Sequence, residues 1–244
     1  MKIVFQHIPK CAGSSIHRML VEAFPGRRVH RERLNALDSY GLESLIHHEI
    51  FSGHYDAWRV GLVPGPKFVF TFLRDPEARV ISLYNFWRSH TWEIIEKRGL
   101  AGPRLAKSNS FEDFLKISDS GIPGNIDNVY VRLALGRAQS LEIQKVITER
   151  PEEALAKAIR YYQSLDFVGL MEHIEADVPL LCSQIGMDVS HIPFENKGQS
   201  GELPNGREAV DPIVISKAAE QLLKERTSLD AEVYRFFKQN PNKA

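Results

Sequence analysis

The chain has 244 residues, of which 43% are hydrophobic and 25% are charged, so it can bury a full core and does not have the composition of a disordered protein. Lys+Arg and Asp+Glu balance at 31 each. This balance excludes an overall positive field that would draw the chain to nucleic acid or an anionic membrane, so an anion site must be built from local groups.

Two cysteines, Cys11 and Cys182, cannot form a disulfide framework, and no Cys/His spacing indicates a metal site. We therefore expect reduced thiols and no metal. The first apolar run, within MKIVFQHIPK, has only three residues, and no stretch of eighteen apolar residues follows. These features predict a cytoplasmic protein with neither a signal peptide nor a transmembrane segment.

Hydrophobic patterning predicts a buried strand at 2–8 and a helix at 16–24, ended by Pro25-Gly26. The run FVFTFL at 68–73 is typical of a central strand of a parallel sheet. Asp75 and Pro76 follow it as the expected N-cap and first residue of a helix.

Further along, the pattern predicts a helix that begins at Pro151, a strand at 166–170 and a helix at about 173–185. A long loop at 186–211 and a last helix at about 212–238 follow. Strands that alternate with helices indicate an α/β fold with a mainly parallel sheet flanked by helices. No repeat or linker divides the chain, so we expect one domain over 1–244.

The segment HIPKCAGSS at 7–15 lies between the first expected strand and helix. A loop that enters a helix presents unpaired backbone N–H groups to an anion. Gly13 allows close approach, Ser14 and Ser15 add hydroxyl donors, and Lys10 adds a full charge, which suits a phosphate or sulfate. The order of residues does not match the Walker loop, and the alternative is a plain turn with serine caps.

Arg74 ends the second strand and Ser82 lies two helical turns later, so the two form a second candidate pair for an anion. The alternative for this segment is a surface pairing of Asp75 with Arg74 or Arg79. In open parallel sheets ligands bind beyond the carboxyl ends of the strands, where both segments begin.

Together, IPKCAGSS and LRDPEARVISLY resemble the two donor motifs of the PAPS-dependent sulfotransferases, in particular the carbohydrate branch that includes the heparan sulfate 2-O-sulfotransferases and their bacterial relatives. The second motif matches at the residues Arg74, Asp75, Pro76, Arg79, Ser82 and Tyr84. Cys11 departs from the usual Thr of the first motif. The blocks FSGHY, NVYVRLALG, FVGLME and Asp230-x-x-x-Tyr234 are similar to further family segments, so the likeness covers most of the chain.

The resemblance implies a P-loop-like three-layer fold and transfer of a sulfuryl group from PAPS to a hydroxyl, with 3′,5′-ADP as the product and no metal. It implies that Lys10 stabilises the leaving phosphate oxygen and that backbone N–H groups from Cys11 and Ala12 to Ser15 hold the 5′-phosphosulfate. Arg74 and Ser82 would hold the 3′-phosphate, and His54 would be the catalytic base.

Some of the histidines in this part of the chain also have a structural interpretation. His54 could be a hydrogen-bonded structural residue. His47 and His48 are expected to be structural at a helix end. His7 lies within the first expected strand, where a buried role is favoured over the alternative of a contact with the site.

We expect the acceptor to be a hydroxyl-bearing carbohydrate or glycolipid and not a nucleic acid. A candidate acceptor-binding insertion covers about 88–127, where a basic excess with Trp87 and Trp92 could equally be a solvated surface. The loop 196–201 could close over the nucleotide or be a solvated linker. The alternatives are a P-loop-like kinase that uses ATP and a catalytically silent nucleotide- or glycan-binding protein.

Overall fold

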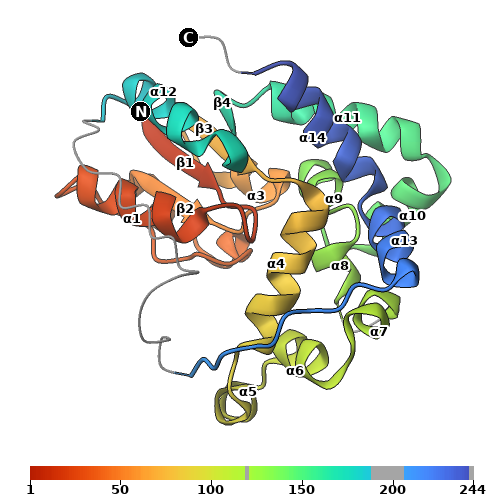
Figure 1. Ribbon diagram of the computed structural model, residues 1–244. Helices are drawn as coiled ribbons and strands as arrows, with labels where there is room; N and C mark the ends of the chain where they lie inside the picture. The colour runs from red at the N-terminus through yellow and green to blue at the C-terminus, as the bar shows by residue number, and fades with distance from the viewer. Residues whose placement is uncertain (119–120, 188–205, 242–244) are drawn as a thin grey trace. The chain divides into compact units, whose positions relative to one another are not determined.

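A computed structural model describes residues 1–118, 121–187 and 206–241 of the chain (Figure 1). The chain divides into two compact units. The first unit comprises Met1–Arg74, Tyr130–Glu195 and Leu229–Ala244, and the second comprises Asp75–Val129 and Asn196–Ser228. The candidate insertion at about 88–127 falls inside the second unit.

The first unit is built on a four-stranded sheet in the order β2-β1-β3-β4. Its strands are β1 (Lys2–Gln6), β2 (Ile50–Gly53), β3 (Lys67–Leu73) and β4 (Phe167–Leu170). All pairings are parallel, with Ile3 opposite both Ile50 and Phe68, and Phe70 opposite Phe167. The parallel sheet flanked by helices confirms the predicted α/β fold.

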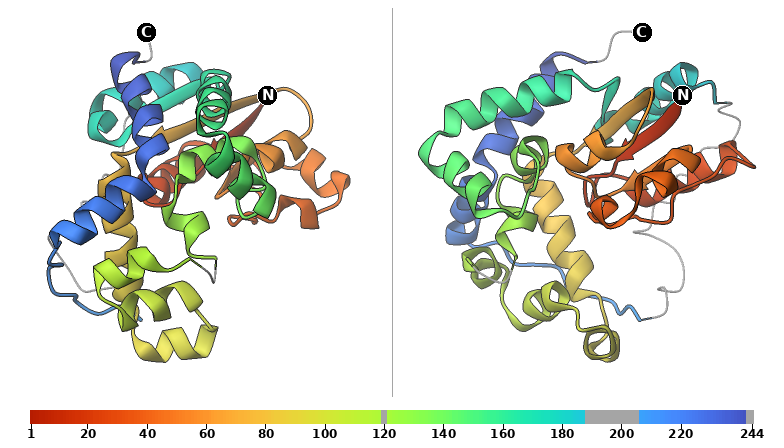
Figure 2. Two further views of the ribbon diagram at one scale, coloured as in Figure 1. Left: turned by 90° about the vertical axis from the view of Figure 1, so that its right-hand side faces the viewer. Right: turned by 180° about the vertical axis from the view of Figure 1, so that it is seen from behind.

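Both faces of the sheet are covered, which explains the nearly continuous apolar sequence of its strands. One face carries Val4, Phe51 and Val69, which pack in a core with Leu45 and Val60. The opposite face carries Phe5 and Phe70, whose rings stack with centroids 4.9 Å apart. Figures 1 and 2 show α1 and α12 over this second face.

The helices of the first unit are α1 (Gly13–Ala23), α2 (Leu42–His47), α3 (Ala57–Leu62), α9 (Val129–Leu135), α10 (Leu141–Glu149), α11 (Pro151–Gln163), α12 (Ile174–Ile185) and α14 (Ser228–Gln239), with two short 3₁₀ helices, η1 (Leu37–Ser39) and η2 (Met171–His173). The elements expected at 151, 166–170 and 173–185 are confirmed as α11, β4 and α12.

The second unit is helical in its described part, with α4 (Pro76–Arg88), α5 (Trp92–Arg98), α6 (Ala101–Ser108), α7 (Phe111–Lys116), α8 (Pro123–Ile126) and α13 (Lys217–Arg226). Asp75 caps α4 as predicted, because its carboxylate accepts the N–H of Ala78 at 2.9 Å. Val80, Leu83 and Tyr84 of α4 pack in the core of this unit.

Two predicted helices differ from the structure. The helix expected at 16–24 begins three residues earlier, at Gly13, so Ser14 and Ser15 lie inside it. The last helix expected at about 212–238 is two helices, α13 and α14. They separate at Thr227, the C-cap of α13, where the backbone leaves helical geometry with φ −116° and ψ 10°. The Thr227 hydroxyl bonds to the carbonyl oxygen of Leu223 at 2.8 Å, a side-chain bond that slightly weakens a helix.

The start of α9 is fixed by a carboxylate from α14. The Oδ1 atom of the fully buried Asp230 accepts the backbone N–H groups of Tyr130 at 2.9 Å and of Val131 at 3.1 Å. These N–H groups belong to the first turn of α9, where a helix has no internal acceptors for them. Asp230 therefore joins two segments that are distant in the sequence.

We expect Asp230→Ala to lower the free energy of unfolding by about 3 kcal/mol, because two buried N–H groups lose a charged acceptor. Asp230→Asn keeps one acceptor oxygen and should cost less. Urea unfolding measures both, and Glu232→Ala on the exposed side of α14 is the matched control, with an expected change of less than about 0.5 kcal/mol. Equal midpoints for Asp230→Ala and Glu232→Ala would contradict this role.

Candidate functional site

Three strands of the sheet end at the predicted site residues. β1 leads into the loop 7–12, β2 is followed by His54, and β3 is followed by Arg74. The chain leaves β1 for β2 on one side and then returns to β3 on the other side, so β1 and β3 flank the switch point of the sheet. Parallel sheets bind ligands at this position. Ser82 lies on α4, in the second unit.

The loop between β1 and α1 has an unusual backbone. Lys10 and Ala12 have φ angles of 71° and 57°, in the left-handed region that residues other than glycine rarely adopt. Among the described residues, no side chain caps α1, and its first turn carries no acidic residue. The first N–H groups of a helix have no acceptor inside the helix, so this uncapped helix start suits an anion better than the alternative of serine caps.

Gly13 is required by the close approach of His7. A methyl group at position 13 would overlap the imidazole ring of His7. The first residue of α1 thus packs directly against a side chain that leaves the end of β1. This contact explains why the loop needs a glycine at this point.

Arg74 is tied to the loop and to α9. Its Nη1 atom donates to the carbonyl oxygen of Lys10 at 3.4 Å. The Tyr130 hydroxyl accepts the N–H of Arg74 at 3.2 Å and donates to the carbonyl oxygen of Arg74 at 2.6 Å. The predicted loop and the predicted arginine are therefore in contact.

Cys11 points into the protein. Its side chain is fully buried, and its Sγ atom lies 3.8 Å from the Tyr130 hydroxyl oxygen and 3.9 Å from the carbonyl oxygen of Pro9. Its backbone N–H donates to the carbonyl oxygen of Ile8 at 3.2 Å. Both groups of Cys11 that could bind a ligand thus have internal partners.

His54 lies beside His7, with ring centroids 4.5 Å apart. Burial, followed by the positive charge of Arg33, lowers the pKa of His54 to about 4. Burial also lowers the pKa of His7 well below its usual value, with His54, Arg33, His17 and Lys10 as further causes. Both imidazoles are therefore neutral at pH 7, and a neutral imidazole can accept a proton.

Tyr130 and His17 were not predicted as members of this site, and for His7 a contact with the site was the less favoured alternative. His7 is buried as expected, but it also contacts Gly13 and His54, so it is part of the site. Tyr130 lies in the block NVYVRLALG, which carried the only signal for it. His17, on the second turn of α1, is linked to the site through the electrostatics of His7.

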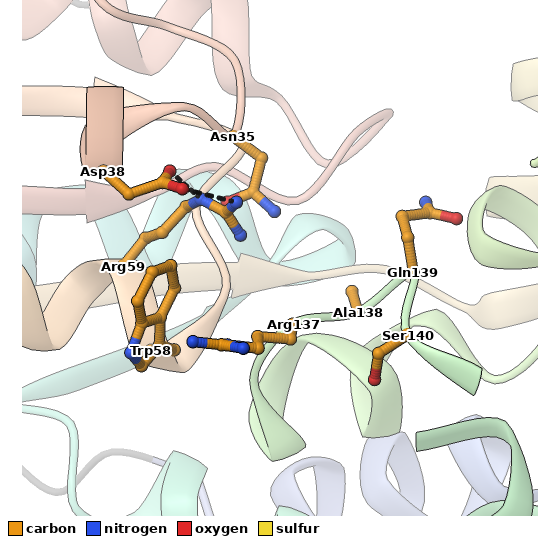
Figure 3. Close-up of a pocket in the computed structure, with 8 residues that line it drawn as sticks. All are labelled: Asn35, Asp38, Trp58, Arg59, Arg137, Ala138, Gln139 and Ser140. Carbon is orange, nitrogen blue, oxygen red and sulfur yellow. Dashed lines mark hydrogen bonds and ion pairs between the residues drawn. The ribbon is translucent and has the colours of Figure 1, made fainter. Parts of the chain in front are cut away.

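A pocket of about 450 Å³ has some lining residues that are close to His54 in the sequence (Figure 3). It is lined by Asn35, Asp38, Trp58, Arg59, Arg137, Ala138, Gln139 and Ser140. His54 and Trp58 are four residues apart, so their Cα atoms are separated by at most about 14 Å.

The polar groups of this pocket differ in how they are paired. Arg59 donates to Asp38 at 2.8 Å and to the buried Asp56 at 2.7 Å. The guanidinium of Arg137 stacks over the Trp58 ring, 4.5 Å from its centroid, and within the described part of the chain it forms no ion pair. The pocket therefore places the Arg137 guanidinium beside an indole ring, and its charge also acts on Asp38.

Other predicted residues lie outside this group. The loop 196–201 is outside the described residues. In the basic segment, Arg104 pairs with Glu96 and Lys107 with Glu208, whereas Lys97 and Arg98 are exposed on α5. His48 bonds to the carbonyl oxygen of Ser44, which fits its expected structural role.

In the described ranges, no group of three or more His, Cys, Asp or Glu side chains is placed to hold a metal ion. None of the helices in those ranges is long and apolar enough to cross a membrane.

A model of the sulfotransferase family matches residues 1–237, which span both units. The chain therefore belongs to the sulfotransferase family and is a transferase. A comparison with curated proteins finds no match.

We expect Gly13→Ala to weaken binding of 3′,5′-ADP at least tenfold (about 1.4 kcal/mol), because the added methyl group displaces the His7 ring and with it the loop. Calorimetry measures the affinity. Gly61→Ala is the matched control, since a methyl group at Gly61 meets no atom within 4 Å and Gly61 lies inside α3. Unchanged affinity in Gly13→Ala would contradict a role of this loop in nucleotide binding.

Proposed function

We propose that the chain transfers a sulfuryl group from PAPS to a hydroxyl of a carbohydrate or glycolipid, as in the branch related to the heparan sulfate 2-O-sulfotransferases. One observation supports this proposal above all. The uncapped start of α1, the Arg74 guanidinium and the His7–His54 pair meet at the carboxyl ends of three neighbouring strands. Groups that can bind an anionic donor and a group that can accept a proton are thus close together.

The residues around the loop fit a phosphosulfate. Backbone N–H groups from Ala12 to Ser15 would hold the 5′ end of the donor, and Lys10 would stabilise the charge that develops on the leaving phosphate oxygen. Arg74 would bind the 3′-phosphate, with Ser82 assigned from the sequence motif. Because the groups of Cys11 have internal partners, we assign this residue to the support of the loop.

His54 is the proposed base. As the acceptor oxygen bonds to sulfur, the bond from sulfur to the phosphate oxygen breaks, and the hydroxyl proton moves to the neutral imidazole of His54. The products are the sulfated acceptor and 3′,5′-ADP. Because the pKa of His54 in the free protein is about 4, the base is unprotonated throughout the neutral range.

The two alternatives receive less support. The sulfotransferase family match does not favour an ATP-dependent kinase. The silent-protein alternative depended on Cys11, whose thiol is buried against Tyr130 and does not face a ligand. The exchange of Thr for Cys at this position is therefore compatible with an intact site.

The pocket beside Trp58 is the proposed acceptor site. Its lining is polar apart from Trp58 and Ala138, and amide, hydroxyl and guanidinium groups suit a hydroxyl-bearing sugar. Its lining residue Trp58 is four residues from His54 in the chain, which limits the distance between their Cα atoms to about 14 Å.

The central test compares 3′,5′-ADP with ATP by calorimetry, because a sulfotransferase should prefer the 3′-phosphorylated ligand. We expect His54→Ala to bind 3′,5′-ADP like the wild type but to lose at least a hundredfold of labelled-sulfate transfer in a screen of glycan acceptors. His47→Ala, at the exposed end of α2, is the control. A preference for ATP would refute the proposal, and full activity of His54→Ala would refute the assignment of the base.

For the pocket, we expect Arg137→Gln to raise the KM for the glycan acceptor about fivefold or more, with unchanged affinity for 3′,5′-ADP. Arg160→Gln, an equal loss of charge on the exposed side of α11, should change neither value. A weaker affinity for 3′,5′-ADP in Arg137→Gln would place Arg137 with the nucleotide instead.

A further inference from the structure

Arg33 is a cation without a counterion inside the described structure. Its guanidinium forms no ion pair or hydrogen bond with the described residues, and its Nε atom is buried without a partner. Burial lowers the pKa of Arg33, so the surroundings penalise its charge. Leaving a buried donor without an acceptor is unfavourable, and more so when the donor is charged. Such a group needs an explanation.

The surroundings of Arg33 are histidines. The backbone N–H of His54 donates to the Arg33 carbonyl oxygen at 2.9 Å, which places the Arg33 segment beside the end of β2. The Arg33 charge acts on the imidazoles of His7, His17 and His54. His17, on α1, has a buried Nδ1 atom that also lacks a partner.

Among the described residues, none of the charges that act on Arg33 or on these histidines is a carboxylate. The charges that act on His7 come from His54, Arg33, His17 and Lys10, and those on His17 and His54 come from Arg33. The group that acts on Arg33 is the Tyr55 hydroxyl. An arginine kept beside a reaction site with unused donors and no acid is suited to an oxyanion.

We infer that Arg33, together with His17, forms a second oxyanion-binding position beside His54, for an anionic oxygen group of one of the two reactants. The inference rests on the proposed function for its reactants. The oxygen group belongs either to the sulfuryl group of the donor or to an acidic substituent of the acceptor, and both present the same chemistry to a guanidinium. Arg33 is thus a binding residue distinct from the loop 7–15 and Arg74.

This position also affects the proposed base. Without an anion, the Arg33 charge holds the pKa of His54 down, below what burial alone would give. An oxyanion on Arg33 offsets that charge and strengthens His54 as a base. The base is then strongest when the reactants are present.

The test uses inorganic sulfate and the full chain saturated with 3′,5′-ADP, so that the nucleotide fills the loop. Histidine ring resonances followed by NMR should show saturable sulfate binding at His17 and His54. We expect Arg33→Gln to weaken this binding about tenfold or more and to raise the pKa of His54 in the free protein. Unchanged sulfate affinity in Arg33→Gln would overturn the inference.

Arg31→Gln is the matched control, because it removes the same charge two residues away. Arg31 is exposed, and its charge acts on His30. This variant should raise the pKa of His30 and leave sulfate binding and His54 unchanged. Should Arg33→Gln not fold, Arg33→Lys keeps the charge without the planar fork. It should preserve the pKa of His54 and weaken sulfate binding severalfold; wild-type sulfate affinity in Arg33→Lys would then overturn the inference.

A comparison of PAPS binding with 3′,5′-ADP binding identifies which reactant carries the oxyanion. If Arg33→Gln weakens PAPS binding but not 3′,5′-ADP binding, Arg33 holds the sulfuryl group. If sulfate binding is lost while both nucleotides bind as before, Arg33 holds the acceptor. If the wild type does not bind 3′,5′-ADP, the proposed function fails, but the sulfate titration without nucleotide still tests Arg33.

Discussion

The proposed site depends on the hydroxyl group of Tyr130. It bonds to the N–H and the carbonyl oxygen of Arg74 and lies beside the Cys11 thiol, so it joins the end of β3 to the loop after β1. Tyr130 is itself fixed from two further helices, since Asp230 accepts its N–H and the Tyr162 hydroxyl donates to its carbonyl oxygen at 2.9 Å. Elements spread over most of the chain therefore contribute to holding the loop beside Arg74.

The electrostatics of the site differ from those of the whole chain. Acidic and basic residues balance at 31 each, yet Lys10, Arg33 and Arg74 gather at the strand ends with histidines. Burial and these cations keep the imidazoles neutral, which makes them available as proton acceptors at neutral pH. A local excess of positive charge in a neutral protein selects small anions without attracting nucleic acid in general.

Much of the sheet and the positions of the two donor motifs could be predicted from the sequence, because buried parallel strands and capped helices have strong local signals. Asp75-Pro76 is one such signal. β2 was not predicted, since IFSG is short and ends in polar residues, and its stability comes from pairing with β1. The roles of Tyr130 and Arg33 arise from contacts between distant segments. No local pattern of residues contains that information.

The left-handed backbone at Lys10 and Ala12 has a consequence for the energetics of recognition. Each such residue costs on the order of 1–3 kcal/mol, and this cost is met when the protein folds, since the Tyr130 and Arg74 contacts already hold the loop in this shape. A ligand that enters does not have to order the loop and so loses little conformational entropy there. Under the proposed function, preorganisation of this kind would let a short segment bind an anion with a smaller entropic cost.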